Sequence, residues 1–449
     1  MPPSVPQATA FDPASSDPTE AELIAARPGL ARHAMDGLLM DGVPLNAVAD
    51  ALGTPTWVYS ATTMRARLAE LTAALAGLDA QVHYAVKAND HLAVLRLMQA
   101  GGAGADVVSG GELLRARKAG IAAGHIVFSG VGKTVGDLRL ALAEGIHQIN
   151  VESPAELEMI SAIADGMGVT AEIALRINPD VDAGTHAKIT TGRADNKFGI
   201  AYDEAAGLYA HAATLPGVRP CGLALHIGSQ ITAMAPYRAA FARAGELIRA
   251  LRAAGHTVSR MDCGGGLGIG YGDEAGASPA AFAGALRHAF AAMGVTLMIE
   301  PGRWLVGPAG VLLASVVLNK GADAVGRERF MVLDAAMNDL IRPAMYEAWH
   351  GIVPLSPGNG AALQPIDVVG PVCETGDTFA RGRMLAPVGA GGRVALLDAG
   401  AYGAVMSSTY NARPLAAIAW IDAGRWVCIR PRQTVEALWA GETIPDLAG

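Results

Sequence analysis

Four apolar runs in the sequence are each followed by polar residues or glycines that could do chemistry. The residues that follow these runs are Lys87, His226, Ser229, Gln230, Gly264, Gly265, Gly266, Glu300 and Arg303. A lysine at the end of a buried strand can have a lowered pKa, which makes its amine able to form a Schiff base with a carbonyl compound. Glycines let backbone amide groups approach an anion such as phosphate closely. The set is typical of a site that joins a Schiff-base lysine to an anion-binding loop.

Each of these residues also has a plainer explanation when it is taken alone. A lysine is usually a solvated surface residue, and a glycine run is often only a tight turn. His226 alone reads as a core histidine, and Glu300 alone as a structural acid. Their shared position directly after apolar runs favours the functional explanation, because it would place all of them together.

The apolar runs alternate with Ala- and Leu-rich stretches of helical period, such as Met64–Leu75 and Pro236–Ala254. This alternation is typical of βα units on a parallel sheet. The strand-like runs are Val82–Val86, Ala105–Val108, His125–Phe128, Gln148–Val151, Glu172–Ile177, Gly222–His226, Val258–Asp262 and Thr296–Glu300. These eight units predict a (β/α)₈ barrel, whose strands carry the chemistry at their carboxyl ends. The polar residues would therefore meet at one mouth of the barrel.

The pattern changes after Pro308, where strand-like runs are separated by Gly/Pro turns without long helices. These runs are Val311–Leu318, Arg329–Leu333, Asp367–Val369, Arg393–Leu397 and Trp426–Ile429. The predicted fold class is α/β, with a (β/α)₈ TIM barrel over residues 60–308 and a C-terminal β-sandwich or barrel-like domain over 309–449. Residues 31–59 are assigned to the β domain, because Thr56–Tyr59 reads as a strand. Residues 1–30 are expected to form a disordered tail.

Composition and charge exclude several classes of protein. The chain of 449 residues has 34 Lys and Arg against 42 Asp and Glu, and no basic run that could neutralise successive phosphates, which argues against nucleic-acid binding. Apolar runs such as Gly310–Leu318 are far shorter than the roughly 20 residues that span a bilayer. No secretory signal is expected at the N-terminus. The four cysteines, Cys221, Cys263, Cys373 and Cys428, form no CxxC pair, so we expect no metal site, no disulfide framework and a cytoplasmic location.

Six short motifs, in this order along the chain, resemble those of the fold-type III decarboxylases, which depend on pyridoxal 5'-phosphate (PLP). They are YAVKAN at Tyr84–Asn89, HIGSQ at His226–Gln230, GGGLGIGY at Gly264–Tyr271, EPGR at Glu300–Arg303, CETGD at Cys373–Asp377 and DAGAYG at Asp398–Gly403. Each motif alone is a weak signal, but six in family order are a strong one. The resemblance covers nearly the whole chain from about residue 40 and implies an alanine racemase-like barrel followed by a β domain.

The resemblance also implies a role for each matching residue. Lys87 would hold PLP as a Schiff base, and Cys373 would donate a proton to the product, with Lys87 or Tyr402 as alternatives. The cofactor would be bound by Lys87, His226, Ser229, Gly264, Gly265, Gly266, Glu300, Pro301, Gly302, Arg303 and Tyr402. The amino-acid substrate would be bound by Arg303, Arg342, Tyr346, Glu374 and Tyr402. Glu300 would keep the pyridine nitrogen protonated, which a decarboxylase needs.

Three segments indicate the branch of this family. HIGSQ, NKFGI at Asn196–Ile200 and IRPAMY at Ile341–Tyr346 resemble the enzymes that act on diaminopimelate, the last step of lysine biosynthesis. The alternatives are a decarboxylase of ornithine, arginine, lysine or carboxynorspermidine, a racemase of the same fold, or a non-catalytic regulator. Trp304, Pro308, Ala412 and Leu415 depart from the family pattern and put the fine fit of the substrate in doubt.

The resemblance implies a homodimer in addition to the small-molecule substrate. In this family the Cys-Glu and Tyr segments of one subunit face the PLP of the other. Cys373, Glu374 and Tyr402 would then complete the site of the partner subunit, an expectation that comes from the family alone.

Overall fold

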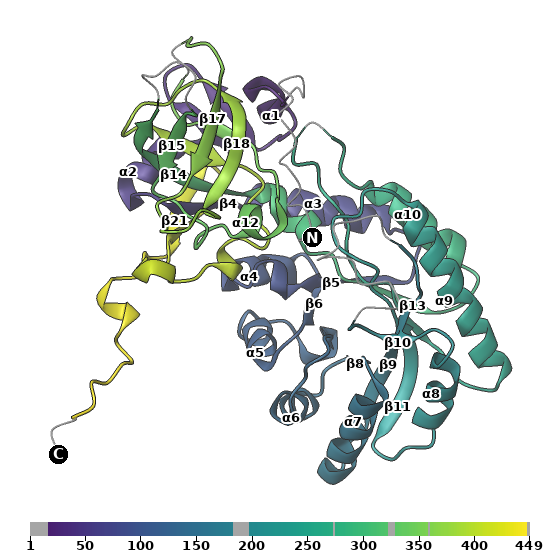
Figure 1. Cartoon of the computed structure of the whole chain (residues 1–449). Helices are drawn as coiled ribbons and strands as arrows, with labels where there is room; N and C mark the ends of the chain where they lie inside the picture. The colour runs from purple at the N-terminus through teal and green to yellow at the C-terminus, as the bar shows by residue number, and fades with distance from the viewer. Residues whose placement is uncertain (1–16, 183–196, 273, 322–327, 358–359, 447–449) are drawn as a thin grey trace, which may run out of the picture.

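Eight parallel strands close into a barrel in the first two thirds of the chain (Figure 1). The computed structural model describes residues 17–182, 197–272, 274–321, 328–357 and 360–446. The barrel strands are β5 (Ala80–Ala85), β6 (Gly104–Val107), β7 (Ile126–Phe128), β8 (Gln148–Val151), β9 (Ala171–Asn178), β11 (Val218–Ala224), β12 (Arg260–Asp262) and β13 (Thr296–Ile299). The ring closes because β13 pairs with β5 and β8 pairs with β9, and the short β10 (Ile200–Ala201) adds to β9. All eight predicted barrel strands are confirmed.

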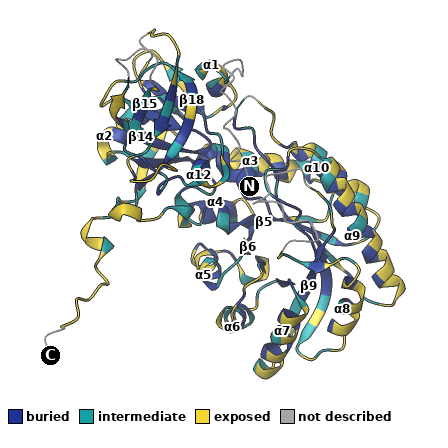
Figure 2. Cartoon of the chain, viewed as in Figure 1, coloured by how far each residue is buried: buried dark blue, intermediate teal, exposed yellow. Residues whose placement is uncertain are grey.

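Helices alternate with these strands and cover the outside of the barrel. They are α3 (Ala61–Ala74), α4 (Leu92–Ala100), α5 (Gly110–Lys118), α6 (Val135–Glu144), α7 (Pro154–Met167), α8 (Ala205–Ala212), α9 (Ala235–Ala253) and α10 (Pro279–Phe290). Each presents a buried face to the sheet and an exposed face to solvent (Figure 2). Side chains of Ser60, Ser109 and Ser153 accept the free backbone N–H groups at the first turns of α3, α5 and α7, and each cap is worth about 1 kcal/mol.

A second, mostly antiparallel sheet forms the β domain and is drawn at the upper left of Figure 1. Its strands are β4 (Thr56–Ser60), β14 (Gly310–Lys320), β15 (Phe330–Leu333), β16 (Ile352–Pro354), β17 (Gln364–Val369), β18 (Thr378–Leu385), β19 (Arg393–Leu396), β20 (Ala417–Asp422) and β21 (Arg425–Arg430). The order is β18-β17-β15-β14-β4-β20-β21, and β19 joins β16 to β14. The expectation that Thr56–Tyr59 would pair with this domain is confirmed, because β4 lies between β14 and β20.

The segment before β4 has more structure than the sequence predicts. It contains α1 (Glu20–Ala25), the three-stranded sheet of β1 (Leu30–His33), β2 (Gly37–Met40) and β3 (Val43–Pro44), and α2 (Leu45–Leu52). The disordered tail predicted for residues 1–30 is therefore wrong for its second part. Thr19 forms a capping box with Glu22 at the start of α1, and Arg27 forms a buried ion pair with Asp398. Residues 1–16 lie outside the described part of the chain.

The remaining domain boundaries, 60–308 for the barrel and 31–59 with 309–449 for the β domain, stay a prediction about independent units. Both bodies contribute to one large core, which runs from the barrel into the β domain. A second core lies under the N-terminal segment. Among the described helices, none combines the length and the apolar character that a membrane crossing requires.

Candidate active site

Lys87 lies in η1 (Val86–Ala88), the single turn that follows β5. Its Nζ donates a hydrogen bond of 2.5 Å to Oδ2 of Asp106, a fully buried residue of β6. Burial lowers the pKa of Lys87, but the charges of Asp106 and Glu300 outweigh this effect, so the net pKa is raised. The prediction of a lowered pKa is therefore wrong for this arrangement. The Lys87 ammonium must therefore lose a proton before its amine can act as a nucleophile.

Three carboxyl groups share the barrel interior next to Lys87: Asp106, Asp262 at the end of β12, and Glu300 just after β13. Ser129 Oγ donates to Glu300 Oε1 at 3.2 Å, and Asn150 Nδ2 donates to Asp262 Oδ2 at 2.8 Å. Burial raises the pKa of Glu300 well above its usual value, and the charges of Asp106 and Asp262 raise it further. The raised pKa favours the neutral form of Glu300, whose side chain is hydrogen-bonded to Asp262.

The glycine run packs directly against His226 and Glu300. Gly265 N donates to His226 Nδ1 at 3.3 Å, which leaves the imidazole neutral, and burial and the charge of Arg176 lower the pKa of His226 well below its usual value. A side chain on Gly265 would bring its Cβ to 1.9 Å from the Glu300 carbonyl oxygen. The loop can approach this closely only because these positions have no side chain.

Arg303 connects several of the other predicted residues. It begins α11 (Arg303–Val306), and its Nη2 donates to Ser229 Oγ at 3.1 Å while its Nη1 donates to the Tyr271 hydroxyl at 2.7 Å. The guanidinium lies 4.8 Å from the centre of the Tyr402 ring. Tyr402 in turn donates its backbone N–H to Ala88 O at 2.8 Å, directly beside Lys87.

Pro301 and Gly302 hold this segment against the turn that carries Lys87. The carbonyl of Pro301 accepts the N–H of Ala85 at 3.1 Å. A Cβ on Gly302 would come within 2.9 Å of the Ala88 side chain. Both residues therefore lie against the turn of Lys87, and their role in binding the cofactor stays a prediction.

Arg342 also contacts Tyr271. It begins α12 (Arg342–Tyr346), is 5% exposed, and its guanidinium lies 4.7 Å from the centre of the Tyr271 ring. Arg342 Nη1 is 2.8 Å from Nε2 of His350, whose Nδ1 contacts Leu397 O at 2.7 Å. Burial lowers the pKa of Arg342, and the charge of Arg303 adds to this effect. Two buried cations that contact one tyrosine form a place where a carboxylate is favoured.

The Cys373 and Glu374 pair is not joined to this cluster. Both residues are exposed in the turn between β17 and β18, and among the described residues no hydrogen bond links their side chains to Lys87 or Arg342. The turn is held firmly, since Asp377 accepts the N–H groups of Val372 and Met337 at 2.8 and 2.7 Å. Cys373 N also donates to Asn411 Oδ1 at 3.0 Å.

Two of the predicted residues remain to be placed. Tyr346, at the end of α12, is partly buried, and its charge acts on Arg303. Asn196 of the NKFGI segment lies outside the described residues. Sequence reasoning missed Asp106, Asp262, Tyr271 and His350 as members of the site. The one available signal for Asp106 and Asp262 was an acidic residue inside an apolar strand.

The donor set fits pyridoxal phosphate. Lys87 offers an amine, Glu300 a buried carboxyl group with a raised pKa, His226 a neutral flat ring, and Ser229 and the glycine run an anion site. Oδ1 of Asp106 is buried and, within the described residues, has no hydrogen-bond partner. A parallel barrel with these groups at the carboxyl ends of its strands defines a pyridoxal-dependent enzyme.

Comparison with known proteins agrees with this class and narrows it. Residues 61–307 match the family model "Pyridoxal-dependent decarboxylase, pyridoxal binding domain". A diaminopimelate decarboxylase of Zymomonas mobilis is 46% identical over 410 residues, which are 90% of this chain and 96% of that protein. One of Pseudomonas fluorescens is 45% identical over 408 residues, 91% of this chain and 97% of that protein. The chain belongs to the diaminopimelate decarboxylase family.

Solved structures give the same result. The diaminopimelate decarboxylase of Helicobacter pylori complexed with L-lysine superposes with a TM-score of 0.85 at 36% identity and covers 88% of this chain and 98% of that one. The M. jannaschii enzyme in complex with L-lysine has a TM-score of 0.88 at 33% identity, with 94% and 99% covered. The barrel and the following β domain are therefore arranged as in this family.

Proposed function

We propose that this protein is a carboxy-lyase that converts meso-2,6-diaminopimelate into L-lysine and CO2 with PLP as its cofactor, the last step of lysine biosynthesis. The observation that carries the proposal is the pair Arg303 and Arg342, which both contact Tyr271, with Arg303 linked through Tyr402 to the turn of Lys87. Diaminopimelate keeps a carboxylate at the end that does not react, and two buried arginines suit it. The relatives named for this reaction and those complexed with L-lysine support the same substrate.

The residues around Lys87 have separate roles in binding the cofactor and in the reaction. When bound, the pyridoxal ring takes up the electron pair that remains when the bond to the carboxylate breaks. Lys87 would attach the cofactor through Nζ, and Asp106 would position that amine through its hydrogen bond. Glu300 would lie beside the ring nitrogen and favour its protonated form, and the positive charge there would offset the burial cost of the Glu300 carboxylate. Neutral His226 would pack on the ring, and Gly264, Gly265, Gly266, Ser229 and Tyr402 would bind the phosphate.

Cys373 is our proposed donor of the proton that replaces CO2, with Lys87 and Tyr402 as alternatives. Its turn is exposed but anchored by Asp377, which suits a group that is presented to another surface. We therefore propose a homodimer in which Cys373 and Glu374 of one subunit complete the site of the other. A cytoplasmic location agrees with the free cysteines in the described structure.

A mixing experiment tests the shared site. Lys87→Ala and Cys373→Ala are each expected to be inactive. Mixed dimers should regain activity, because one of their two sites has both residues, and random mixing yields about a quarter of the wild-type rate. Failure to regain activity, although the subunits exchange, would place Cys373 outside the site of the partner.

The substrate itself is tested by CO2 release from meso-diaminopimelate, lysine, ornithine and arginine. We expect turnover with meso-diaminopimelate, and much less with the other three, which lack the distal carboxylate. Preferred turnover of ornithine, arginine or carboxynorspermidine would favour the rival decarboxylases. A racemase is disfavoured because Glu300 stands at the expected ring-nitrogen position, and a non-catalytic regulator is disfavoured because both Lys87 and Cys373 are present.

A further inference from the structure

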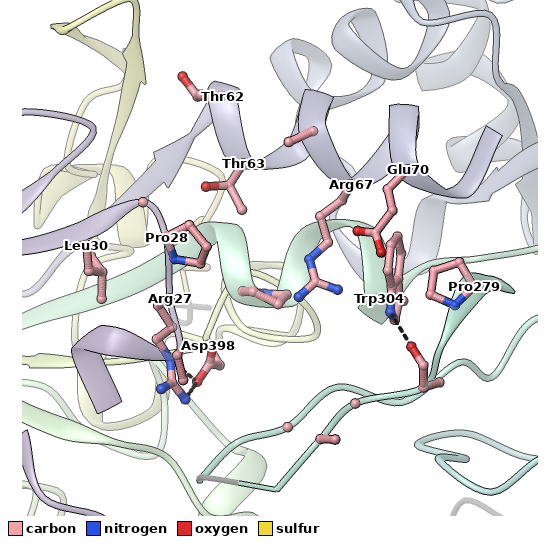
Figure 3. A pocket seen from close by; sticks show the side chains of 18 of the residues that line it. Arg27, Pro28, Leu30, Thr62, Thr63, Arg67, Glu70, Pro279, Trp304 and Asp398 are labelled. Atoms are coloured by element: carbon pink, nitrogen blue, oxygen red, sulfur yellow. Dashed lines mark hydrogen bonds and ion pairs between the residues drawn. The ribbon is translucent and has the colours of Figure 1, made fainter. Parts of the chain in front are cut away.

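A cavity of about 700 Å³ lies apart from Lys87, between α3, the N-terminal segment and the loop that follows β12 (Figure 3). The backbone around Pro28 and Leu30 forms one wall, and α3 forms another. Trp304, the residue directly after Arg303, closes the third side. The predicted mechanism does not use this space, although Gly270 and Asp398 of two family motifs line it.

One arginine in the cavity, Arg67, forms no ion pair among the described residues, although the negative charges of Glu70 and Asp398 lie close enough to act on it. The Arg67 guanidinium lies 4.4 Å from the centre of the Trp304 ring, and within the described chain it makes no hydrogen bond or ion pair. Trp304 is fixed, since it is 2% exposed and its Nε1 donates to Ala277 O at 3.1 Å. Figure 3 shows Arg67 and Glu70 reaching from α3 toward Trp304. Arg67 thus offers a cation above an apolar ring at the cavity wall.

The remaining charges of the cavity are mostly negative. Its ionisable lining residues are Arg27, Asp41, Arg67, Glu70, Glu274 and Asp398. Arg27 forms an ion pair with Asp398. Glu274 accepts hydrogen bonds from the backbone N–H groups of Tyr271 and Gly272 at 2.7 and 2.8 Å. The other charged residues of the cavity are the cation Arg67 and the acids Asp41 and Glu70. Asp41 accepts a hydrogen bond from the Ser60 hydroxyl. A matching ligand has one anionic group and a surplus of cationic groups.

We propose that this cavity is a second binding site for a basic α-amino acid, with the ligand carboxylate on Arg67 and its ammonium groups toward Glu70 and Asp41. The volume is in the range of small-molecule sites, and the alkyl chain of such a ligand would contact Trp304. The proposal rests on the charges of the cavity and does not depend on the proposed reaction.

The cavity shares its walls with segments of the candidate active site. Trp304 adjoins Arg303, and Arg27 contacts both Asp398 and, through Nη2 at 2.6 Å, the carbonyl of Tyr271. Asp398 belongs to the segment that carries Tyr402. A ligand here therefore contacts the chain on both sides of the Arg303–Tyr271 hydrogen bond, which makes the cavity a place where an amino acid could regulate the site.

Equilibrium dialysis of the holoenzyme with radiolabelled L-lysine tests the proposal. Wild type should bind one equivalent per chain more than Arg67→Gln, in which affinity at the cavity falls roughly tenfold or more with the loss of a charge-assisted bond. Arg65→Gln is the matched control, because Arg65 is on the same helix but pairs with Asp422 outside the cavity. It should bind as wild type does.

Two analogues separate the charges of the ligand. Norleucine lacks the side-chain ammonium and cadaverine lacks the carboxylate, so both should displace the extra equivalent of lysine poorly. Equal stoichiometry in Arg67→Gln and wild type would overturn the proposal, and so would cadaverine that competes as well as lysine. CO2 release should persist in Arg67→Gln. If the wild-type enzyme released CO2 from none of the substrates, that result would contradict the proposed function and not the second binding site.

Discussion

Tyr271 contacts two buried arginines, Arg303 and Arg342. We expect this pair of arginines to determine which substrate the site accepts. Arg303 reaches the Tyr271 hydroxyl at 2.7 Å, whereas Arg342 lies over the Tyr271 ring. The Arg342→Met substitution should lower kcat/KM for meso-diaminopimelate by roughly 30-fold to 1000-fold, because it removes a charge-assisted contact worth about 2 to 4 kcal/mol. Any activity on lysine should fall much less. Steady-state kinetics with both substrates measure this, and an unchanged preference would remove Arg342 from the substrate pocket.

His350 is a positioning residue for Arg342. It contacts Arg342 through one ring nitrogen and Leu397 O through the other. Burial lowers the pKa of His350 well below its usual value, so the ring stays neutral. The positive charge of Arg342 therefore stays available to pair with an anionic ligand. His350→Phe should raise KM for meso-diaminopimelate more than it lowers kcat, while His350→Gln should restore part of the affinity. Equal effects of the two variants would mean that the ring only fills space.

The Lys87→Ala variant should lose turnover and covalent cofactor attachment, and keep its fold. Among the described residues, the Lys87 amine is hydrogen-bonded only to Asp106, and its side chain is 35% exposed, so the apolar core does not depend on it. Borohydride reduction followed by mass measurement detects attached PLP, and circular dichroism reports the fold. Equal attachment in wild type and variant would show that another amine holds the cofactor.

Motifs can locate single residues of the site, but not the partners that lie across the barrel. Lys87, His226, Glu300 and Arg303 follow apolar runs and were placed together from that pattern. Asp106 and Asp262 lie inside strands, where an acid among apolar residues is only a weak signal, and they join the site only when the eight strands close. His350 is far along the chain from Leu397, so no local spacing predicts their contact.

At the scale of elements, the glycine run after β12 determines how closely the sheet ends approach one another. Gly265→Ala should weaken PLP binding and destabilise the fold by at least about 2 kcal/mol, since its Cβ would overlap the Glu300 carbonyl. Gly284→Ala is the control, because Gly284 lies in α10 with open space around it and a helical alanine is favoured. Cofactor titration and urea unfolding measure both. Unchanged PLP affinity in Gly265→Ala would show that the loop does not bind the cofactor.

The barrel could be predicted from the sequence because each strand is a short apolar run between helices. In the β domain β16, β18 and β20 were not predicted. The strand β18 includes Arg381, Gly382 and Arg383, which break the alternation of apolar and polar residues. The strand β20 begins AIAW, and its alanines resemble the helical stretches of this chain. Their strand state depends on partners such as β17 and β4, which are distant in sequence.

At the scale of the whole molecule, buried histidines at the amino ends of the barrel strands set the response to acid. Burial and nearby histidines lower the pKa of His83 to about 3, and burial and Arg260 lower that of His147 to about 4. The unfolded chain binds protons near pH 6.5, so stability is full above that pH and falls as pH drops toward 4. Each histidine contributes a slope of about 1.4 kcal/mol per pH unit.

Replacing one of these histidines should reduce that slope. Urea unfolding of His83→Leu between pH 4.5 and 8 should depend on pH less steeply than wild type. The exposed His288 on α10 provides the control, and His288→Leu should leave the slope nearly unchanged. Identical slopes in wild type and His83→Leu would show that other groups govern the acid response.

The central place of β4 in the β domain affects the order in which the chain folds as it leaves the ribosome. β4 is synthesised before every barrel strand, yet its neighbours β14 and β20 are synthesised after the last one. The side chains of Trp57 and Tyr59 are fully buried in the finished fold. Their neighbours β14 and β20 are missing while the whole barrel is synthesised, so these side chains stay exposed during that time. During that interval they form a natural target for a chaperone. The β domain is complete only when β14 and β20, made after the barrel, have paired with β4.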